Sequence, residues 1–324
     1  IFGLLLKKRS FTRSYILGFV ISFIPAVFLY LINTYLGIPL NTVLVIFVYF
    51  ALPIIGFALL KKRSLESLEV NNKEIVFLFI VLFATTIIAI GIVDNESLFM
   101  SNGTRVYARM QYAVNGLIND GSIPIYNPGM GQGEATFLWD SPSRAAQFIF
   151  PNFMLQFIPP ILFFNAYSFF ILLISVLSLG ILYDSILNRK KSMSNILAIS
   201  AVTVSIGLGF HFLQLLESLK QFTAFPIAYF LLALVIDNPK NFREFLILAY
   251  FSSMIMTIHS SYGFGVIVLA ASIFIFRKGY YIRNREEIKQ FMNWARKSKL
   301  LILAALVILI SLPIFYFGGG IIYN

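Results

Sequence analysis

The sequence predicts an all-α membrane protein: a polytopic transmembrane helix bundle of about nine spans with one large loop outside the membrane. Three observations predict this class. The 324-residue chain is 59% hydrophobic and 12% charged, whereas soluble domains are roughly 45–50% apolar and about 25% charged. Its apolar runs approach the ~20 residues that a helix needs to cross a bilayer core of about 30 Å. The alternating pattern of a transmembrane β-barrel is absent from the sequence.

The apolar segments place the predicted spans in order along the chain. We expect them at 14–33, 42–60, 75–93, 160–187, 193–211, 223–237, 244–258, 262–276 and 300–317. The spans 223–237, 244–258 and 262–276 are short for a full crossing, so they either tilt into a thinned bilayer or line a cavity that opens to one side. The chain begins without Met on six apolar residues and ends abruptly, so we expect 1–324 to be a fragment of a longer transmembrane domain.

Positive charges alternate between the two sides of this predicted bundle. The clusters at 7–13, 61–73, 189–191, 239–243 and 277–299 hold 21 of the 25 Lys and Arg residues and fall on every second connection. Cytoplasmic connections carry such an excess, so we expect these segments inside the cell and the 94–159 loop outside it. The basic segment 277–299 is predicted to be a surface helix on anionic headgroups. The net charge of +11 therefore indicates membrane orientation and not nucleic-acid binding.

Two carboxylates stand where the third span ends. The segment 75–93 has no charged residue, and Asp94 and Glu96 follow it directly. Carboxylates in this position either mark the water line or belong to an active site at the membrane surface. The chain has no cysteine for thiolate or disulfide chemistry, and its two histidines are too few for a multi-histidine metal site.

The outer loop continues with an amphipathic segment and a turn-rich segment. Apolar residues at helical spacing in 104–120, with Arg105 and Arg109 on the remaining surface, predict a helix lying flat on the outer membrane face. The stretch 119–133 holds four Gly and two Pro, which predicts turns and neither strand nor helix. Long loops of this kind in compact proteins are often functional.

The loop sequence resembles that of a known superfamily. The acidic pair, the Arg-bearing helix and "GSIPIYNPGMGQG" (121–133) resemble the first large outer loop of the GT-C superfamily, over about 94–145. These are polytopic glycosyltransferases that use polyprenyl-phosphate sugars, and the loop is most similar to uncharacterised archaeal and bacterial members. An acidic motif of the Asp-x-Asp type stands in that family where Asp94 and Glu96 stand here. Three spans precede the loop, more than is usual, and the WWDYG-type motif of oligosaccharyltransferases is absent.

The resemblance implies sugar transfer from a polyprenyl-phosphate donor to an acceptor on the extracytoplasmic side of a prokaryotic cell membrane. Asp94 or Glu96 would be the base for the acceptor hydroxyl, or both would hold a divalent cation, Mg²⁺ or Mn²⁺, through carboxylate oxygens. Positive groups would stabilise the departing phosphate. The candidates that we place outside are Arg105, Arg109, Arg144, Lys220 and His259, and further loop candidates are Asp140 and Glu134.

Each candidate also has a purely structural interpretation. The acidic pair could only mark the water line, and the paired arginines could extend from an interfacial helix toward water. Asp140 could form the turn before a proline, Glu134 could be solvated, and His259 could hydrogen-bond at a helix end. The sequence leaves these alternatives open.

Two other classes of function fit the same sequence. A transporter or flippase for lipids or oligosaccharides would place ionisable residues along a path through the membrane, but few lie within the predicted spans. Asp184 and Asp237 lie near the cytoplasmic ends of their spans and do not form a relay. A non-catalytic scaffold descended from a transferase would keep the transmembrane spans but would not catalyse sugar transfer. Membrane lipids are the expected surroundings in every case.

Overall fold

The computed structural model describes part of the chain. The described residues are 11–21, 25, 29, 32–33, 36–60, 72–90, 112, 115–116, 119–121, 126–127, 134–135, 159–187, 196–205, 207, 219–237, 252, 265–273 and 293. Within them the regular structure is α-helical apart from two strands of two residues each. The described residues therefore confirm a helical fold.

The long helices overlap five of the predicted spans. They are α1 (Phe11–Ile21), α3 (Thr42–Leu60), α4 (Asn72–Ile90), α8 (Pro160–Leu187) and α10 (Leu219–Ile236). Shorter helices occupy Ile196–Ser205 and 265–273. The bounds of α3 and α8 coincide with the predicted spans 42–60 and 160–187. The helix α4 begins earlier than predicted because its first turn is polar and hydropathy does not detect it.

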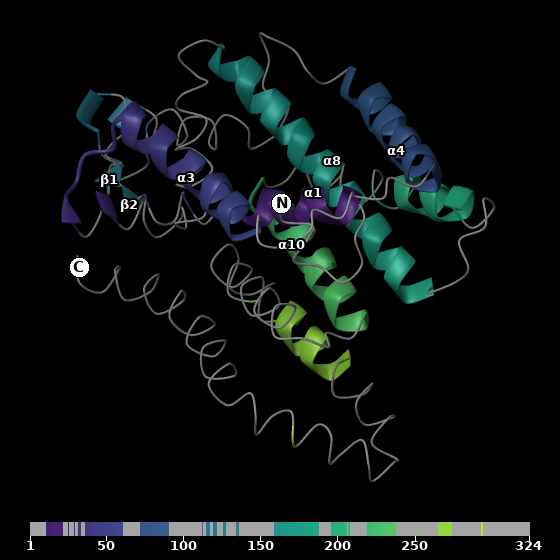
Figure 1. The fold of residues 1–324 in the computed structure, drawn as a ribbon. Coiled ribbons are helices and arrows are strands. Elements are labelled where there is room, and N and C mark those ends of the chain that lie inside the picture. The colour runs from purple at the N-terminus through teal and green to yellow at the C-terminus, as the bar shows by residue number, and fades with distance from the viewer. Residues whose placement is uncertain are drawn as a thin grey trace.

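The central helix of the bundle is α8 (Figure 1). Its most extensive interface is with α10, and it also packs against α4 and α1. Ile171 and Ile174 of α8 and Phe230 of α10 are fully buried in the hydrophobic core. Burial of each such side chain contributes about 1.5–3 kcal/mol relative to exposure in water. The core therefore lies along α8, and the other helices are arranged around it.

Small and hydroxyl-bearing residues occupy buried positions of α4 and α8 within this core. Ser175 and Ser178 of α8 are fully buried, and each hydroxyl donates to the carbonyl four residues earlier, at 2.8 and 2.7 Å. Thr85 of α4 does the same at 2.6 Å. Gly180 lets the ring of Phe77 lie against the α8 backbone, where any Cβ would overlap the ring. Small residues such as Gly180 are enriched at helix contacts in membranes because they let backbones approach closely.

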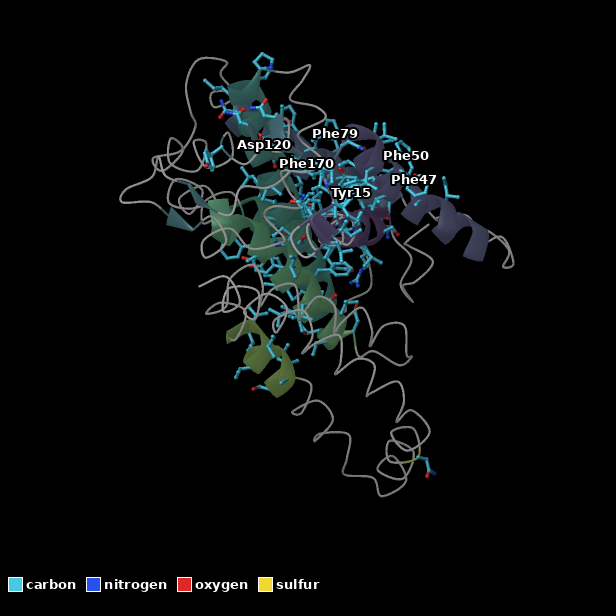
Figure 2. The ribbon with its side chains drawn as sticks, turned by 90° about the vertical axis from the view of Figure 1, so that its left-hand side faces the viewer. Tyr15, Phe47, Phe50, Phe79, Asp120 and Phe170 are labelled. Atoms are coloured by element: carbon cyan, nitrogen blue, oxygen red, sulfur yellow. The ribbon has the colours of Figure 1, made fainter. Side chains whose placement is uncertain are left out.

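The helices α3 and α4 carry large apolar side chains on their exposed surfaces. On α4 the exposed large apolar residues are Ile75, Phe79, Leu82, Phe83 and Ile87, and on α3 they are Val43, Ile46, Phe47, Phe50 and Ile54 (Phe47, Phe50 and Phe79 are labelled in Figure 2). Phe79 is 66% exposed, and the fully buried positions of α4 are Val81 and Thr85. The surface helix of a soluble protein instead carries polar residues on its outward face.

Length and composition identify one described helix as able to cross a membrane. This is Phe169–Leu187 within α8, and the two further apolar helices found in the described residues, Ile196–Ser205 and Ala224–Ile236, are shorter. A core helix of a soluble protein passes the same test, because it is also long, apolar and mostly buried. The nine-span arrangement is therefore not confirmed by the described residues.

The 94–159 segment contains helical positions and one pair of short strands among its described residues. Residues 112, 115–116 and 119–120 are helical, as the amphipathic pattern of 104–120 predicts. Strand β1 (Tyr126–Asn127) pairs antiparallel with β2 (Glu134–Ala135), with Tyr126 opposite Ala135. The prediction that 119–133 contains neither strand nor helix is wrong at β1 and at the helical residues 119–120. The reason is that Gly-rich sequences also connect paired strands, so turn composition does not exclude a hairpin.

Candidate functional site

Most residues of the predicted outer site lie outside the described part of the chain. This group comprises Asp94, Glu96, Arg105, Arg109, Asp140, Arg144 and His259. Glu134 lies in β2 and Lys220 in the first turn of α10, but their side chains are not described. The distances within this predicted site, and its fit to a divalent cation, therefore stay predictions. Among the described residues there is no group of three or more His, Asp or Glu side chains that could hold a metal ion.

A described contact attaches the outer loop to the helical bundle. The buried Asn33 side-chain amide donates to the carbonyls of Ile38, at 3.0 Å, and Gly121, at 3.2 Å. The backbone N–H of Leu40 donates to the same Gly121 carbonyl at 2.6 Å. Gly121 has φ 62°, and a Cβ there would lie 3.0 Å from the Cβ of Pro39. Because only glycine adopts this conformation at no cost, the loop is fitted to the turn before α3 at this residue.

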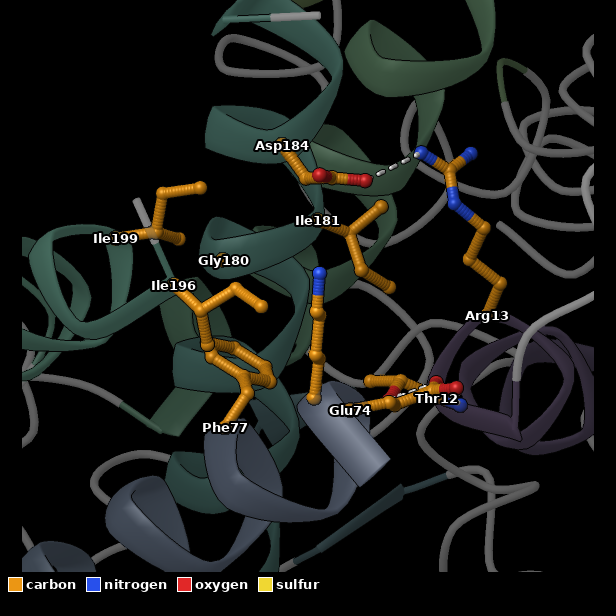
Figure 3. A pocket seen from close by; sticks show the side chains of 10 residues that line it. Thr12, Arg13, Glu74, Phe77, Gly180, Ile181, Asp184, Ile196 and Ile199 are labelled. Atoms are coloured by element: carbon orange, nitrogen blue, oxygen red, sulfur yellow. Dashed lines mark hydrogen bonds and ion pairs between the residues drawn. The ribbon is translucent and has the colours of Figure 1, made fainter. Parts of the chain in front are cut away.

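The described residues also form a polar site at the ends of four helices. Figure 3 shows four of its side chains, those of Thr12, Arg13, Glu74 and Asp184. We call it the Arg13 cluster, and its members are Thr12, Arg13, Glu74, Asp184, Ser185 and Asp237. The helices α1 and α4 begin here, while α8 and α10 end here. The cluster thus brings together the helix ends that adjoin four of the five basic segments.

The guanidinium of Arg13 is the centre of this cluster. One nitrogen donates to Asp237 Oδ2 at 2.6 Å, and the other donates to Ser185 Oγ at 2.7 Å and lies 3.9 Å from Asp184 Oδ2. The Ser185 hydroxyl donates in turn to Asp237 Oδ2 at 3.3 Å. The Arg13 side chain is only 5% exposed, and a buried charge is tolerated when it is paired and hydrogen-bonded.

Thr12, the neighbour of Arg13, ties α1 to a different helix. Its backbone N–H and its hydroxyl both donate to Glu74 Oε1, each at 2.7 Å. The N–H groups of a first helical turn lack partners within the helix, so this carboxylate satisfies one of them. Glu74 also lies in the first turn of α4, where negative charge interacts favourably with the helix dipole. Two consecutive residues thereby join α1 to α4, α8 and α10.

A small cavity adjoins the Arg13 cluster. It is lined by Thr12, Arg13, Lys73, Glu74, Phe77, Gly180, Ile181, Asp184, Ile196 and Ile199. Its volume is about 80 Å³, well below the roughly 300–1,000 Å³ of pockets that enclose small molecules. Since a water molecule occupies about 30 Å³ in the liquid, the cavity suits a few water molecules and not a lipid-linked sugar.

Comparisons of the chain with protein-family models, with curated proteins and with solved structures give no significant match. The function is therefore argued from the residues and their contacts.

The sequence alone does not predict the Arg13 cluster. It places Arg13 in a basic segment, and Asp184 and Asp237 at the ends of two separate spans. The available signal was that all three lie at ends of apolar spans predicted to share one side. Helix packing decides which of these ends touch, and a hydropathy pattern does not predict how helices pack.

Proposed function

We propose that this chain is a polytopic membrane glycosyltransferase of the GT-C type. It would transfer a sugar from a polyprenyl-phosphate donor to an acceptor at the extracytoplasmic surface. The observation that carries the proposal is the apolar surface of α3 and α4, which supports a membrane environment for the bundle. The chemistry is supported by the resemblance of residues 94–145 to the GT-C outer loop.

The apolar surface is informative because of its size and position. The exposed residues of α4 repeat at the spacing of one helix face, and Phe79 and Phe83 stack with ring centroids 6.0 Å apart. Hydration of each large apolar side chain would cost roughly 1.5–3 kcal/mol relative to burial. Lipid tails remove this cost, because they are as apolar as the side chains themselves. Large exposed apolar surfaces are rare in soluble monomers.

The contact of the outer loop with the bundle supports the proposed position of the site. Asn33 contacts the loop at Gly121, and it lies twenty residues after Arg13 in the chain. The helix α1 ends at Ile21, and the described positions 25, 29, 32 and 33 after it are also helical. This geometry supports a loop at the end of the bundle away from the Arg13 cluster.

The proposed reaction is a displacement at the anomeric carbon of the donor sugar. The acceptor hydroxyl oxygen bonds to that carbon while the bond to the polyprenyl phosphate oxygen breaks, and the polyprenyl phosphate leaves with the bonding pair. The hydroxyl proton passes to the carboxylate of Asp94 or Glu96. Arg105, Arg109 and Arg144 are the proposed donors to the departing phosphate, for which guanidinium geometry is suited.

Sugar transfer in proteoliposomes tests the proposal. With radiolabelled polyprenyl-phosphate sugars as donors, Asp94→Asn and Glu96→Gln should lower turnover by about 10²–10⁴-fold, the typical contribution of a positioned acid or base. The matched control is Asp120→Asn, which removes an exposed carboxylate of the same loop and should leave turnover unchanged. Equal turnover in all variants would overturn the catalytic assignment. Movement of the intact donor between leaflets without transfer would overturn it in favour of a transporter.

A further inference from the structure

We infer that the end of the bundle at the Arg13 cluster binds anionic phospholipids. The inference rests on the membrane placement proposed above and adds to it a lipid partner that takes no part in sugar transfer. Two observations carry it. The packed helix ends bring cations of separate basic segments close together, and exposed apolar side chains adjoin those cations.

Four helix ends are held together at this cluster. The helix α1 begins at Phe11, α4 begins at Asn72, α8 ends at Leu187, and Asp237 directly follows α10. The hydrogen bonds of Thr12 to Glu74, and of Arg13 to Ser185 and Asp237, join these ends. Besides Arg13, six cations lie within three positions of a helix end in the sequence: Lys8, Arg9, Lys73, Arg189, Lys190 and Lys240.

The length of the peptide chain limits how far these cations can lie from the cluster. Arg13 and Lys73 are described, and the other five lie outside the described residues. An extended chain spans at most about 3.6 Å per residue, so three positions reach no further than about 11 Å. This reach is close to the ~8–10 Å over which charges act on one another at physiological salt. Cations from four separate basic segments can therefore act on the same headgroups.

The carboxylates at this end do not cancel the positive charge. Within the same three positions the sequence has four of them, Glu69, Glu74, Asp184 and Asp237, against seven cations. Two of the four are already engaged inside the cluster. Glu74 accepts both hydrogen bonds of Thr12, and Asp237 accepts from Arg13 and Ser185. The helix ends therefore keep an excess of positive charge, which attracts anionic lipid headgroups.

Exposed apolar side chains decide in favour of a lipid surface over a soluble polyanion. Phe11 is the neighbour of Thr12, Ile75 of Glu74 and Ile186 of Ser185, and all three are exposed. A soluble polyanion would leave these side chains in water. The boundary of a bilayer offers phosphate groups beside hydrocarbon, so it matches cations and exposed apolar residues at the same helix ends.

The thermal unfolding midpoint of the purified chain in detergent micelles tests the inference, because a ligand of the folded state raises this midpoint. Dioleoyl phosphatidylglycerol should raise it more than the same amount of zwitterionic dioleoyl phosphatidylcholine. Salt at about 0.5 M should reduce the difference, since it screens the exposed cations. Equal shifts with the two lipids would overturn the inference.

A fourfold variant locates the effect at the helix ends. It combines Lys8→Gln, Arg9→Gln, Arg189→Gln and Lys240→Gln, and it leaves the Arg13 cluster intact. Each cation near an anionic surface contributes roughly fivefold to binding. The concentration of phosphatidylglycerol that gives half of the shift should therefore rise by at least about tenfold. A response like that of the parent chain would overturn the inference.

The matched control keeps the charge at the same four positions. It combines Lys8→Arg, Arg9→Lys, Arg189→Lys and Lys240→Arg, and it should respond as the parent does, because headgroup attraction depends on charge. Loss of the response in this control would overturn the inference. If the neutral fourfold variant does not fold, Arg9→Gln with Lys240→Gln decides. A rise of at least about fivefold is then expected, and a response like that of the parent overturns the inference.

Two further outcomes separate this inference from the proposed function and from a different partner. A chain that stays monodisperse without detergent would overturn both the membrane placement and the lipid interface. A chain that needs detergent but has no preference for phosphatidylglycerol would overturn the lipid interface alone. If heparin, a soluble polyanion, raises the midpoint as much as phosphatidylglycerol does, the partner is a soluble polyanion and the inference is wrong.

Discussion

The Arg13 guanidinium and the Asp237 carboxylate lie 2.6 Å apart although 224 positions separate them in the chain. The contact joins the first turn of α1 to the residue that follows α10, and Ser185 of α8 bridges the same pair. Through it the N-terminal part of the chain is held to the α8–α10 core.

The two carboxylates near Arg13 should differ in their contribution to stability. Asp237→Asn should lower the free energy of unfolding by about 3 kcal/mol, because Arg13 is buried and loses its closest partner. Asp184→Asn should cost about 0–1 kcal/mol, since this carboxylate is 3.9 Å away and 33% exposed. Denaturant titration in detergent micelles measures both. Equal losses for the two variants would contradict the distances in the structure.

The contact of Gly180 with Phe77 should make α8 sensitive to a single methyl group. Gly180→Ala places a Cβ in the space of the Phe77 ring, and such overpacking typically costs about 1–3 kcal/mol. Phe77→Leu in the same chain should recover most of this loss, because the smaller side chain frees the space. The coupling energy of the double-mutant cycle measures the effect. Additive losses would show that the two residues do not touch.

Asn33 should control the attachment of the outer loop. Asn33→Leu removes the hydrogen bonds to Ile38 and Gly121, so proteolysis within 94–159 should become about tenfold faster as the loop opens locally. Asn41→Ala is the matched control, because Asn41 accepts from the Leu44 N–H at 2.7 Å and caps α3 without contacting the loop in the described structure. The prediction fails if both variants are cleaved at the rate of the parent.

The outward surface of α4 should respond to charge as a lipid-facing surface does. Phe79→Lys introduces a charge well inside the helix, and a lysine at the centre of a span costs about 2.5–3.5 kcal/mol on insertion scales. The fraction of chain that resists alkaline extraction from membranes should therefore fall. Ile75→Lys lies beside the polar first turn of α4, where its amine can reach water, and should insert normally. Normal insertion of Phe79→Lys would contradict a lipid-facing α4.

The positions of helices were predictable from the sequence, whereas their contacts were not. The uninterrupted apolar runs set the bounds of α3 and α8, and the amphipathic spacing of 104–120 predicted helical positions in the loop. Hydropathy measures the average environment of a segment, so it overlooked the polar first turn of α4. It also could not pair Arg13 with Asp237, since that contact depends on which helix ends pack together.

For the candidate site, too, the sequence predicted which residues take part but not their contacts. The resemblance at 94–145 predicted the chemistry of the outer loop, but Asp94 and Glu96 lie outside the described residues, so their geometry stays a prediction. The structure contributes the contact between Asn33 and Gly121, for which the sequence signal was only a glycine in a turn-rich stretch. A glycine in such a stretch predicts a turn, and only the packed structure shows what that turn touches.

The central claim is that the helical bundle crosses a membrane with the Arg13 cluster inside and the outer loop outside. Single-cysteine labelling of intact cells tests it most directly, with Asp120→Cys in the loop and Leu187→Cys at the end of α8, both at exposed positions. An impermeant maleimide should label Asp120→Cys in intact cells and Leu187→Cys only after the membrane is permeabilised. Labelling of both thiols in intact cells, or the reverse order, would contradict the claim.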